Sequence, residues 1–432
     1  MFEHHLRRPL SEELHARPFH DFDGAGRFVR FIYLNAEHKK ELNAEIATFL
    51  KNAGQPVPSD DTRFVRADFG AFIFRIERHT EFTSLTFIQK QLEMKKGISD
   101  AAFDEARLPG IPFDWVRRLP VPLFHAIWLE IGGHAPKSMT PDEVCQMLGN
   151  SRSGPSNILN EGAAQVHFSF DIDAAGYSRI VLFNNRVSPS RMGRITLRLV
   201  EMETYRLLAL MGLPLVQNLS GNLSDIDKKL TYLTQTLSEL IEAEDDSDQN
   251  MAHLLSELSA LSAELENIAS MSDFRLSATK AYRQLFDSRQ AALQMGRLDG
   301  HQGVAGFINR RMLPAMQTCA AFSDRLNRLA DRLARSNELL RTQTELTIQH
   351  QNRDLLSSMD KRASLQLRMQ QTVEWLSIAA LTYYGSGLVE TMAKSLPFAQ
   401  AGLSLVAIKA ISVPVLAVLA YLAIRRVSHG AK

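Results

Sequence analysis

Hydrophobic and polar residues alternate in short runs through the first part of the chain. Five of these runs are rich in valine, isoleucine and phenylalanine with partial period-two spacing, which is typical of strands with one buried face. The runs are residues 27–34, 71–78, 124–132, 163–172 and 178–185. Gly176 ends the short link between the last two and predicts a β-hairpin. With helical spacing over 37–52 and 141–148, the pattern predicts a mixed α/β domain over residues 1–188.

From about residue 190 the apolar residues recur at intervals of three and four residues, which predicts helices. Between Asn222 and Met295 there is neither glycine nor proline. The polar, acidic stretch 242–250 predicts a turn between two helices. Ser272 and Asp273 are good N-cap residue types, so they predict a further helix start.

The longest predicted helix lies further along, because no glycine or proline occurs from 315 to 384. We expect one continuous helix from Ala315 to about Ala393. Much of it carries a heptad-like apolar stripe, made of Phe322, Leu326, Leu329, Leu333, Leu340, Leu355 and Met359. Polar gaps in the stripe suit a stalk that packs against several neighbours. Residues 189–372 are therefore predicted to form a helical bundle and stalk.

Charge is balanced along the chain, with 49 lysines and arginines against 48 aspartates and glutamates. This balance gives no indication of a polyanion partner, so no nucleic-acid binding is expected. Arginines such as Arg325 and Arg332 flank the leucines of the long helix, and the interpretation is a solvated face paired with Asp324 and Asp331.

Two segments, residues 375–394 and about 405–424, are apolar and long enough to cross a bilayer as helices. The N-terminus has no apolar region typical of a signal peptide. Basic residues flank the two segments on the sides away from their short link, which predicts cytoplasmic N- and C-termini. The sequence thus predicts a lipid-embedded, two-span transmembrane hairpin over 373–426 and a cytosolic tail over 427–432. The overall fold class is α+β: a cytosolic mixed α/β domain, a helical stalk and this hairpin.

Small and aromatic residues interrupt the first apolar segment at Tyr384, Gly385, Ser386 and Gly387. About ten residues separate Trp375 from Gly385, which places the glycine near mid-bilayer at about 1.5 Å per residue. Small residues at that depth favour close helix packing. A pore-lining kink and the absence of any role are the alternatives.

Glu390 in the first segment and Lys409 in the second lie the same number of residues from the cytosolic edge. Charges inside a membrane tend to pair, so we expect an ion pair that fixes the register of the two spans. In the alternative, Lys409 extends to the headgroups instead.

Other candidate ligands are weaker. The acidic turn could gather a divalent ion through Glu242, Glu244, Asp245, Asp246 and Asp248. A solvated turn is the alternative. Near the N-terminus, a histidine-rich segment matches no zinc spacing and is interpreted as surface or partner-docking; its members are His4, His5, His15 and His20.

No phosphate-binding loop, dinucleotide fingerprint or nucleophile elbow occurs in the sequence. We therefore expect no enzyme activity and no cofactor; a divalent cation would act only as a transported or regulatory ion. The two cysteines, Cys145 and Cys319, are far apart and predict buried free thiols in a reducing compartment.

Three segments carry a resemblance to a bacterial family of uncharacterised membrane-anchored proteins with a domain of unknown function. They are "HHLRRPLSEELHARPF" (4–19), "FDIDAAGYSRIVLFNN" (170–185) and the C-terminal hairpin. This resemblance covers essentially the whole chain. It implies a protein of the inner membrane and assigns no chemistry.

The order of parts also resembles the CorA-type magnesium transporters, which are homopentamers whose long helix forms the stalk and lines the pore. Their signature is Tyr-Gly-Met-Asn. Tyr384-Gly385 matches its first two positions, whereas Ser386 and Gly387 replace the last two.

The resemblance implies a homo-oligomeric divalent cation transporter or channel. The alternative is a non-catalytic membrane-anchored scaffold or sensor with a cytosolic interaction domain and an unknown protein partner.

Overall fold

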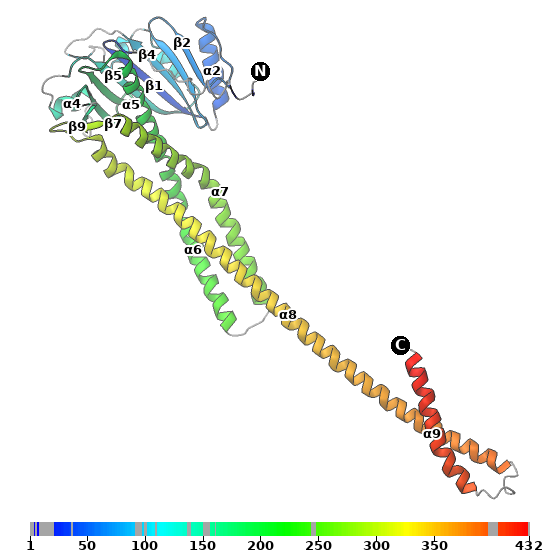
Figure 1. Ribbon diagram of the computed structural model, residues 1–432. Coiled ribbons are helices and arrows are strands. Elements are labelled where there is room, and N and C mark those ends of the chain that lie inside the picture. Colours follow the sequence, from blue (N-terminus) through cyan, green and yellow to red (C-terminus); the bar gives the residue numbers. More distant parts are fainter. Residues whose placement is uncertain are drawn as a thin grey trace. The chain divides into compact units, whose positions relative to one another are not determined.

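The computed structural model divides the chain into two compact units. Unit 1 comprises Met1–Thr234 and Glu257–Ala334, and unit 2 comprises Gln235–Ser256 and Arg335–Lys432. Within them, the structure describes residues 4, 7, 21–35, 38–90, 97–98, 102–108, 110–135, 140–149, 156–159, 161–242, 248–395 and 405–430. Long helices and one mixed sheet account for most of the described residues (Figure 1). The predicted α+β class is confirmed at this level.

Unit 1 contains a nine-stranded sheet with the order β2-β3-β4-β1-β5-β8-β7-β6-β9. Its strands are β1 (Gly26–Leu34), β2 (Phe64–Asp68), β3 (Ile73–Arg78), β4 (Phe82–Lys90), β5 (Leu123–Gly132), β6 (Ser156–Leu159), β7 (Ala164–Ile172), β8 (Ser178–Asn184) and β9 (Met295–Arg297). Neighbouring strands are antiparallel except β5 and β8, which pair in parallel. All five strands expected from the sequence are present.

The structure confirms two local predictions from the sequence, the turn at Gly176 and the helix start at Pro141. Gly176 has a φ of 93° in the link between β7 and β8, a backbone conformation that glycine adopts without strain. Helix α4 (Pro141–Met147) begins with proline in its first turn. Its N-cap Thr140 accepts a hydrogen bond from the Glu143 backbone N–H, and the Glu143 side chain accepts one from the Thr140 backbone. This reciprocal capping box satisfies two otherwise unpaired donors of the helix end.

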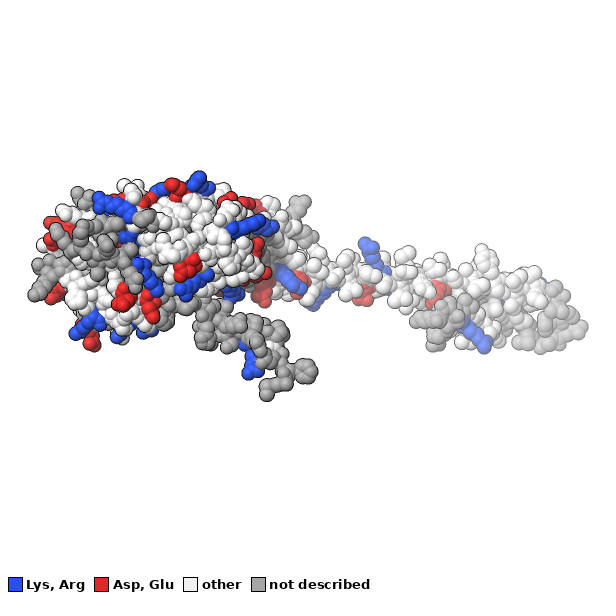
Figure 2. All heavy atoms as spheres, turned by 90° about the horizontal axis from the view of Figure 1, so that it is seen from above, with Lys and Arg blue, Asp and Glu red and all other residues white. Residues whose placement is uncertain are grey.

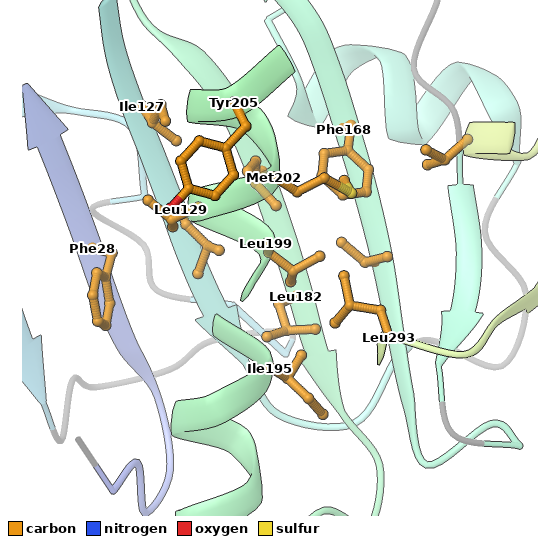
Figure 3. Packing of buried hydrophobic residues seen from close by; sticks show 14 of the residues in the cluster. Phe28, Ile127, Leu129, Phe168, Leu182, Ile195, Leu199, Met202, Tyr205 and Leu293 are labelled. Carbon is orange, nitrogen blue, oxygen red and sulfur yellow. The ribbon is translucent and has the colours of Figure 1, made fainter. Parts of the chain in front are cut away.

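The core has two layers, one on each face of the sheet. On one face, helix α5 (Pro189–Leu210) packs Ile195, Leu199 and Met202 against strand residues such as Leu129 and Leu182 (Figure 3). On the other face, helix α2 (Lys39–Asn52) and the short helix α3 (Phe113–Arg117) cover the second layer. Full burial of each large apolar side chain stabilises the fold by about 1.5–3 kcal/mol, so these layers fix the sheet between the helices.

Three long helices follow: α6 (Gly212–Glu242), α7 (Asp248–Ala292) and α8 (Val304–Ser395). The helix start predicted at Ser272 is wrong, because α7 continues through it. The Ser272 hydroxyl donates to the Ile268 carbonyl oxygen at 2.7 Å, which satisfies it inside the helix. Helix α8 also begins earlier than expected and contains Pro314. From there to Ser395 it is one helix, as predicted.

Ionic contacts join α6 to α8 within unit 1. Asp227 of α6 accepts hydrogen bonds from Arg325 at 3.0 Å and from Arg332 at 2.9 Å, both on α8. These two arginines therefore pair across to another helix, where the sequence had suggested Asp324 and Asp331 on their own helix. On the face shown in Figure 2, acidic and basic side chains are interspersed over unit 1.

Candidate functional site: the C-terminal hairpin

The most distinctive chemistry of unit 2 lies in the end of α8 and in α9 (Leu405–Gly430). Among the described residues, one helix is long and apolar enough to cross a membrane, over Val406–Ile424, and none of that window is buried. The α8 segment from Trp375 falls short of this criterion. Its tyrosines, its glycines and Glu390 lower its apolar character. Two crossings are therefore not established, and α9 is the one candidate span in the described part of the chain.

Gly385 lies at the contact between the two helices. A Cβ atom placed on it would lie 3.2 Å from Leu416 Cδ1 of α9, which is tighter than ordinary van der Waals contact. The neighbouring Ser386 is buried, and its hydroxyl donates to the Tyr383 carbonyl oxygen at 2.8 Å. Because a larger residue at Gly385 would push against Leu416, this geometry corresponds to the packing interpretation of the glycine.

Tyr384 and Gly387 lie differently from Gly385. The Tyr384 side chain is 71% exposed, and no atom lies within 4 Å of a Cβ placed on Gly387. Thr391, one turn further along α8, is also exposed and donates to the Gly387 carbonyl oxygen at 2.9 Å. The four residues of the Tyr384–Gly387 stretch thus divide between the α9 contact and the outer face of α8.

Glu390 forms ion pairs with two lysines, one on each helix of the hairpin. Its Oε2 lies 2.7 Å from Lys409 Nζ on α9, and its Oε1 lies 2.9 Å from Lys394 Nζ on α8. The structure therefore brings together the two charges that the sequence placed at equal depth. It adds Lys394, whose i,i+4 spacing on the same helix is a signal that the sequence analysis missed.

We predict that this pair sets the register of the hairpin. Glu390→Lys or Lys409→Glu alone should lower the melting temperature of the detergent-extracted chain, because each change brings like charges together. The double exchange should recover a clear part of the loss, since the pair between positions 390 and 409 is restored with opposite polarity, although Lys394 still loses its carboxylate partner. Glu345→Lys, which breaks an exposed pair with Arg341 outside the hairpin, is the matched control. A double exchange that loses the sum of both single effects would show that the two charges do not interact.

Unit 1 contains a buried ionic cluster that the sequence did not predict. Glu77 on β3 contacts Arg30 on β1 at 3.0 Å and also pairs with Arg75 two residues away. All three side chains are at most 5% exposed. Burial alone would raise the pKa of Glu77, but the positive charges of Arg30 and Arg75 lower it to about 2. The cluster is internally paired, so it is a structural element of the sheet.

A second buried pair lies on the opposite face of the sheet. Arg27 Nε of β1 lies 3.0 Å from Glu130 Oε1 of β5, and both side chains are fully buried. The indole N–H of Trp128 donates to the same carboxylate at 2.7 Å. The sequence signal for both was the charged residues that interrupt the apolar strand runs, such as Arg30 in β1, Glu77 in β3 and Glu130 in β5.

The structure describes few of the remaining candidate residues in the acidic turn and the histidine-rich segment. Glu244, Asp245 and Asp246 lie outside the described residues, and so do His5, His15 and His20. Helix α6 ends at Glu242 and α7 begins at Asp248, so the break between the two helices lies within the predicted turn, whose last residues already belong to α7. In the described part of the chain, no three histidine, cysteine or acidic side chains gather to hold a metal ion.

The two cysteines differ from each other. Both are free thiols. Cys319 is buried, as expected, and burial raises the pKa of its thiol. Cys145 is only partly buried, so the expectation of a buried thiol is wrong for this residue.

Comparison with known proteins places the chain in one family. Residues 2–430 match the family described as "Protein of unknown function (DUF3422)". The chain belongs to the DUF3422 family. No curated protein and no solved structure matches it. The expected membership of an uncharacterised family is therefore confirmed. None of these comparisons supports the resemblance to CorA-type transporters.

Proposed function

We propose that this DUF3422 protein is an integral membrane protein in which α9, with the end of α8, anchors the α+β unit to a bilayer. Its function is then that of a non-catalytic, homo-oligomeric scaffold or sensor. The observation that carries the proposal is the apolar window Val406–Ile424 of α9, none of which is buried by protein. Hydrocarbon lipid is the medium in which such a helix lies without exposing apolar surface to water.

The orientation follows from the basic residues around the hairpin. Arg426 follows the α9 window, and Lys361, Arg362 and Arg368 precede the apolar part of α8. Positive residues favour the cytoplasmic side, so both termini are cytoplasmic in this proposal, and a bacterial inner membrane is the site. The end of α8 returns through the bilayer beside α9, with Glu390 offsetting the charge of Lys409 there.

A second candidate is a CorA-like homo-oligomeric passage for divalent cations. The favouring observation is the outer face of α8, where Tyr384 and Thr391 present polar groups beside the open position at Gly387. These groups are available to a neighbouring copy. The contact between Gly385 and Leu416 supports the scaffold, because a glycine packed against α9 is not free to line a passage between copies.

Ion flux separates the two candidates. We expect liposomes that contain the purified full chain to be no more permeable to Mg²⁺ than protein-free liposomes, as reported by a magnesium-sensitive dye inside them. The matched variant is Gly387→Trp, which would block a passage on the outer face of α8 but leave the contact with Leu416. Mg²⁺ entry that this variant abolishes would contradict the scaffold and establish the cation passage.

A further inference from the structure

In the part of the chain that the structure describes, no other element covers a long apolar surface in the middle of α8. Every residue from Gln349 to Val373 is exposed, including leucines and methionines such as Leu355 and Met359. The stretch from Ile348 to Leu376, in which only Glu374 is partly buried, is about 43 Å long at 1.5 Å per residue. An isolated helix in water gains no stability from such a surface, since helices are stabilised mainly by packing of an apolar face.

The apolar residues of this stretch follow a seven-residue repeat. With Leu355 at heptad position d, the core positions a and d are Ile348, Asn352, Leu355, Met359, Arg362, Gln366, Met369, Val373 and Leu376. Six of these nine are apolar. A repeat of seven lets a helix bury the same stripe along its whole length against other helices.

The charged residues avoid that stripe. Seven charged side chains lie between Ile348 and Leu376, and six of them occupy the adjacent positions b and c: Arg353, Asp354, Asp360, Lys361, Arg368 and Glu374. Only Arg362 lies at a core position. Positions b and c face solvent when helices associate through a and d. The a and d positions therefore form an apolar face that can contact other helices, and the b and c positions form a charged face that lies in solvent.

We infer that this part of α8 assembles in parallel and in register with the same part of other copies of the chain. Identical helices have the same repeat, so their stripes match along the full length without a shift. The parallel direction rests on the proposed membrane anchoring. Anchors at the same end hold every copy of α8 in one orientation at one height, which raises their effective concentration.

The assembly contains three or more helices. Two-stranded coils commonly carry charged pairs at positions e and g. In this stretch those positions hold no charged residue, and three of them are Leu356, Ala363 and Leu365. The apolar face is thus wider than an a/d seam and contacts more than one neighbour. Asn352, Arg362 and Gln366 form polar layers that specify the register at some cost in stability.

Disulfide cross-linking in native membranes tests this inference. The two native cysteines are replaced by alanine, and single cysteines are introduced into the full chain at core positions (Met359→Cys, Val373→Cys) or outer positions (Ser357→Cys, Ser364→Cys). After mild oxidation, we expect both core variants to form disulfide-linked dimers and the outer variants to remain largely monomeric. Cross-linking at both core positions, 14 residues apart, requires parallel helices in register. Sedimentation of the detergent-extracted chain should give a mass of at least three copies, which Leu355→Glu should reduce to one.

Cross-linking that is equal at core and outer positions, or absent from all of them, would overturn the inference. A sedimentation mass of one or two copies would overturn the assembly of three or more. Membrane fractionation of the same samples keeps the two proposals apart. A chain that fractionates with membranes but does not cross-link leaves the anchor standing and removes the assembly. If the chain cross-links at both core positions but is recovered as soluble protein, the proposed membrane anchor is contradicted and the proposed assembly is supported.

Discussion

Replacing Glu77 by alanine is expected to lower the free energy of unfolding of unit 1 by about 3–5 kcal/mol. Glu77 is the carboxylate between Arg30 and Arg75 in the buried face of the sheet. Without it, two guanidinium groups stay buried near each other with no opposing charge. The measurement is urea denaturation of the detergent-solubilised full chain, followed by tryptophan fluorescence.

The matched control is Asp114→Ala, which breaks an exposed ion pair with Arg117. Exposed pairs contribute little, so this variant should stay within about 1 kcal/mol of the unmodified chain. If Glu77→Ala is no more destabilising than Asp114→Ala, the buried cluster does not stabilise the sheet as argued.

The same cluster predicts how stability changes in acid. The pKa of Glu77 is about 2 in the folded chain and about 4.3 for an unperturbed glutamate. The unfolded chain therefore takes up this proton first as pH falls. The contribution of Glu77 is fully present above about pH 4.3 and disappears as pH approaches 2. The difference in stability between the unmodified chain and Glu77→Ala should accordingly narrow over that interval.

Two arginines in the middle of α9 should remove the chain from the membrane. Val415 and Val418 are exposed residues near the centre of the apolar window. Neither makes the contact with Gly385, which Leu416 makes, so changing them leaves that contact in place. A charged residue at the centre of a membrane helix costs about 2.5–3.5 kcal/mol. The variant with Val415→Arg and Val418→Arg thus loses roughly 5–7 kcal/mol of insertion free energy. Val415→Leu with Val418→Leu changes the same positions without charge and should behave as the unmodified chain.

Local signals in the sequence predicted the parts of the fold that local physics determines. Gly176 predicted the β7–β8 turn, because only a few residues must adopt that geometry. Strand β4 was missed because serine and threonine alternate with its apolar residues, and burial of those hydroxyls depends on neighbouring strands. The Glu77 cluster was missed for a related reason, since Arg30 and Glu77 lie 47 residues apart and meet only through sheet pairing.

The C-terminal hairpin was more predictable because helix geometry is regular. Equal residue counts from the cytosolic edge placed Glu390 and Lys409 at one level, and their contact is 2.7 Å. The sequence could not show which face of α8 meets α9, because Tyr384, Gly385 and Gly387 lie within one turn of each other. That division required the packing of Leu416 on Gly385.

Resistance to alkaline carbonate is the most direct test of the membrane anchor. Membranes from cells that produce the full chain are washed at high pH, which releases peripheral proteins and leaves integral ones in the pellet. We expect the unmodified chain and the double leucine variant to stay in the pellet and the double arginine variant to be released. Recovery of the unmodified chain in the supernatant would contradict the anchor, and with it the proposed function.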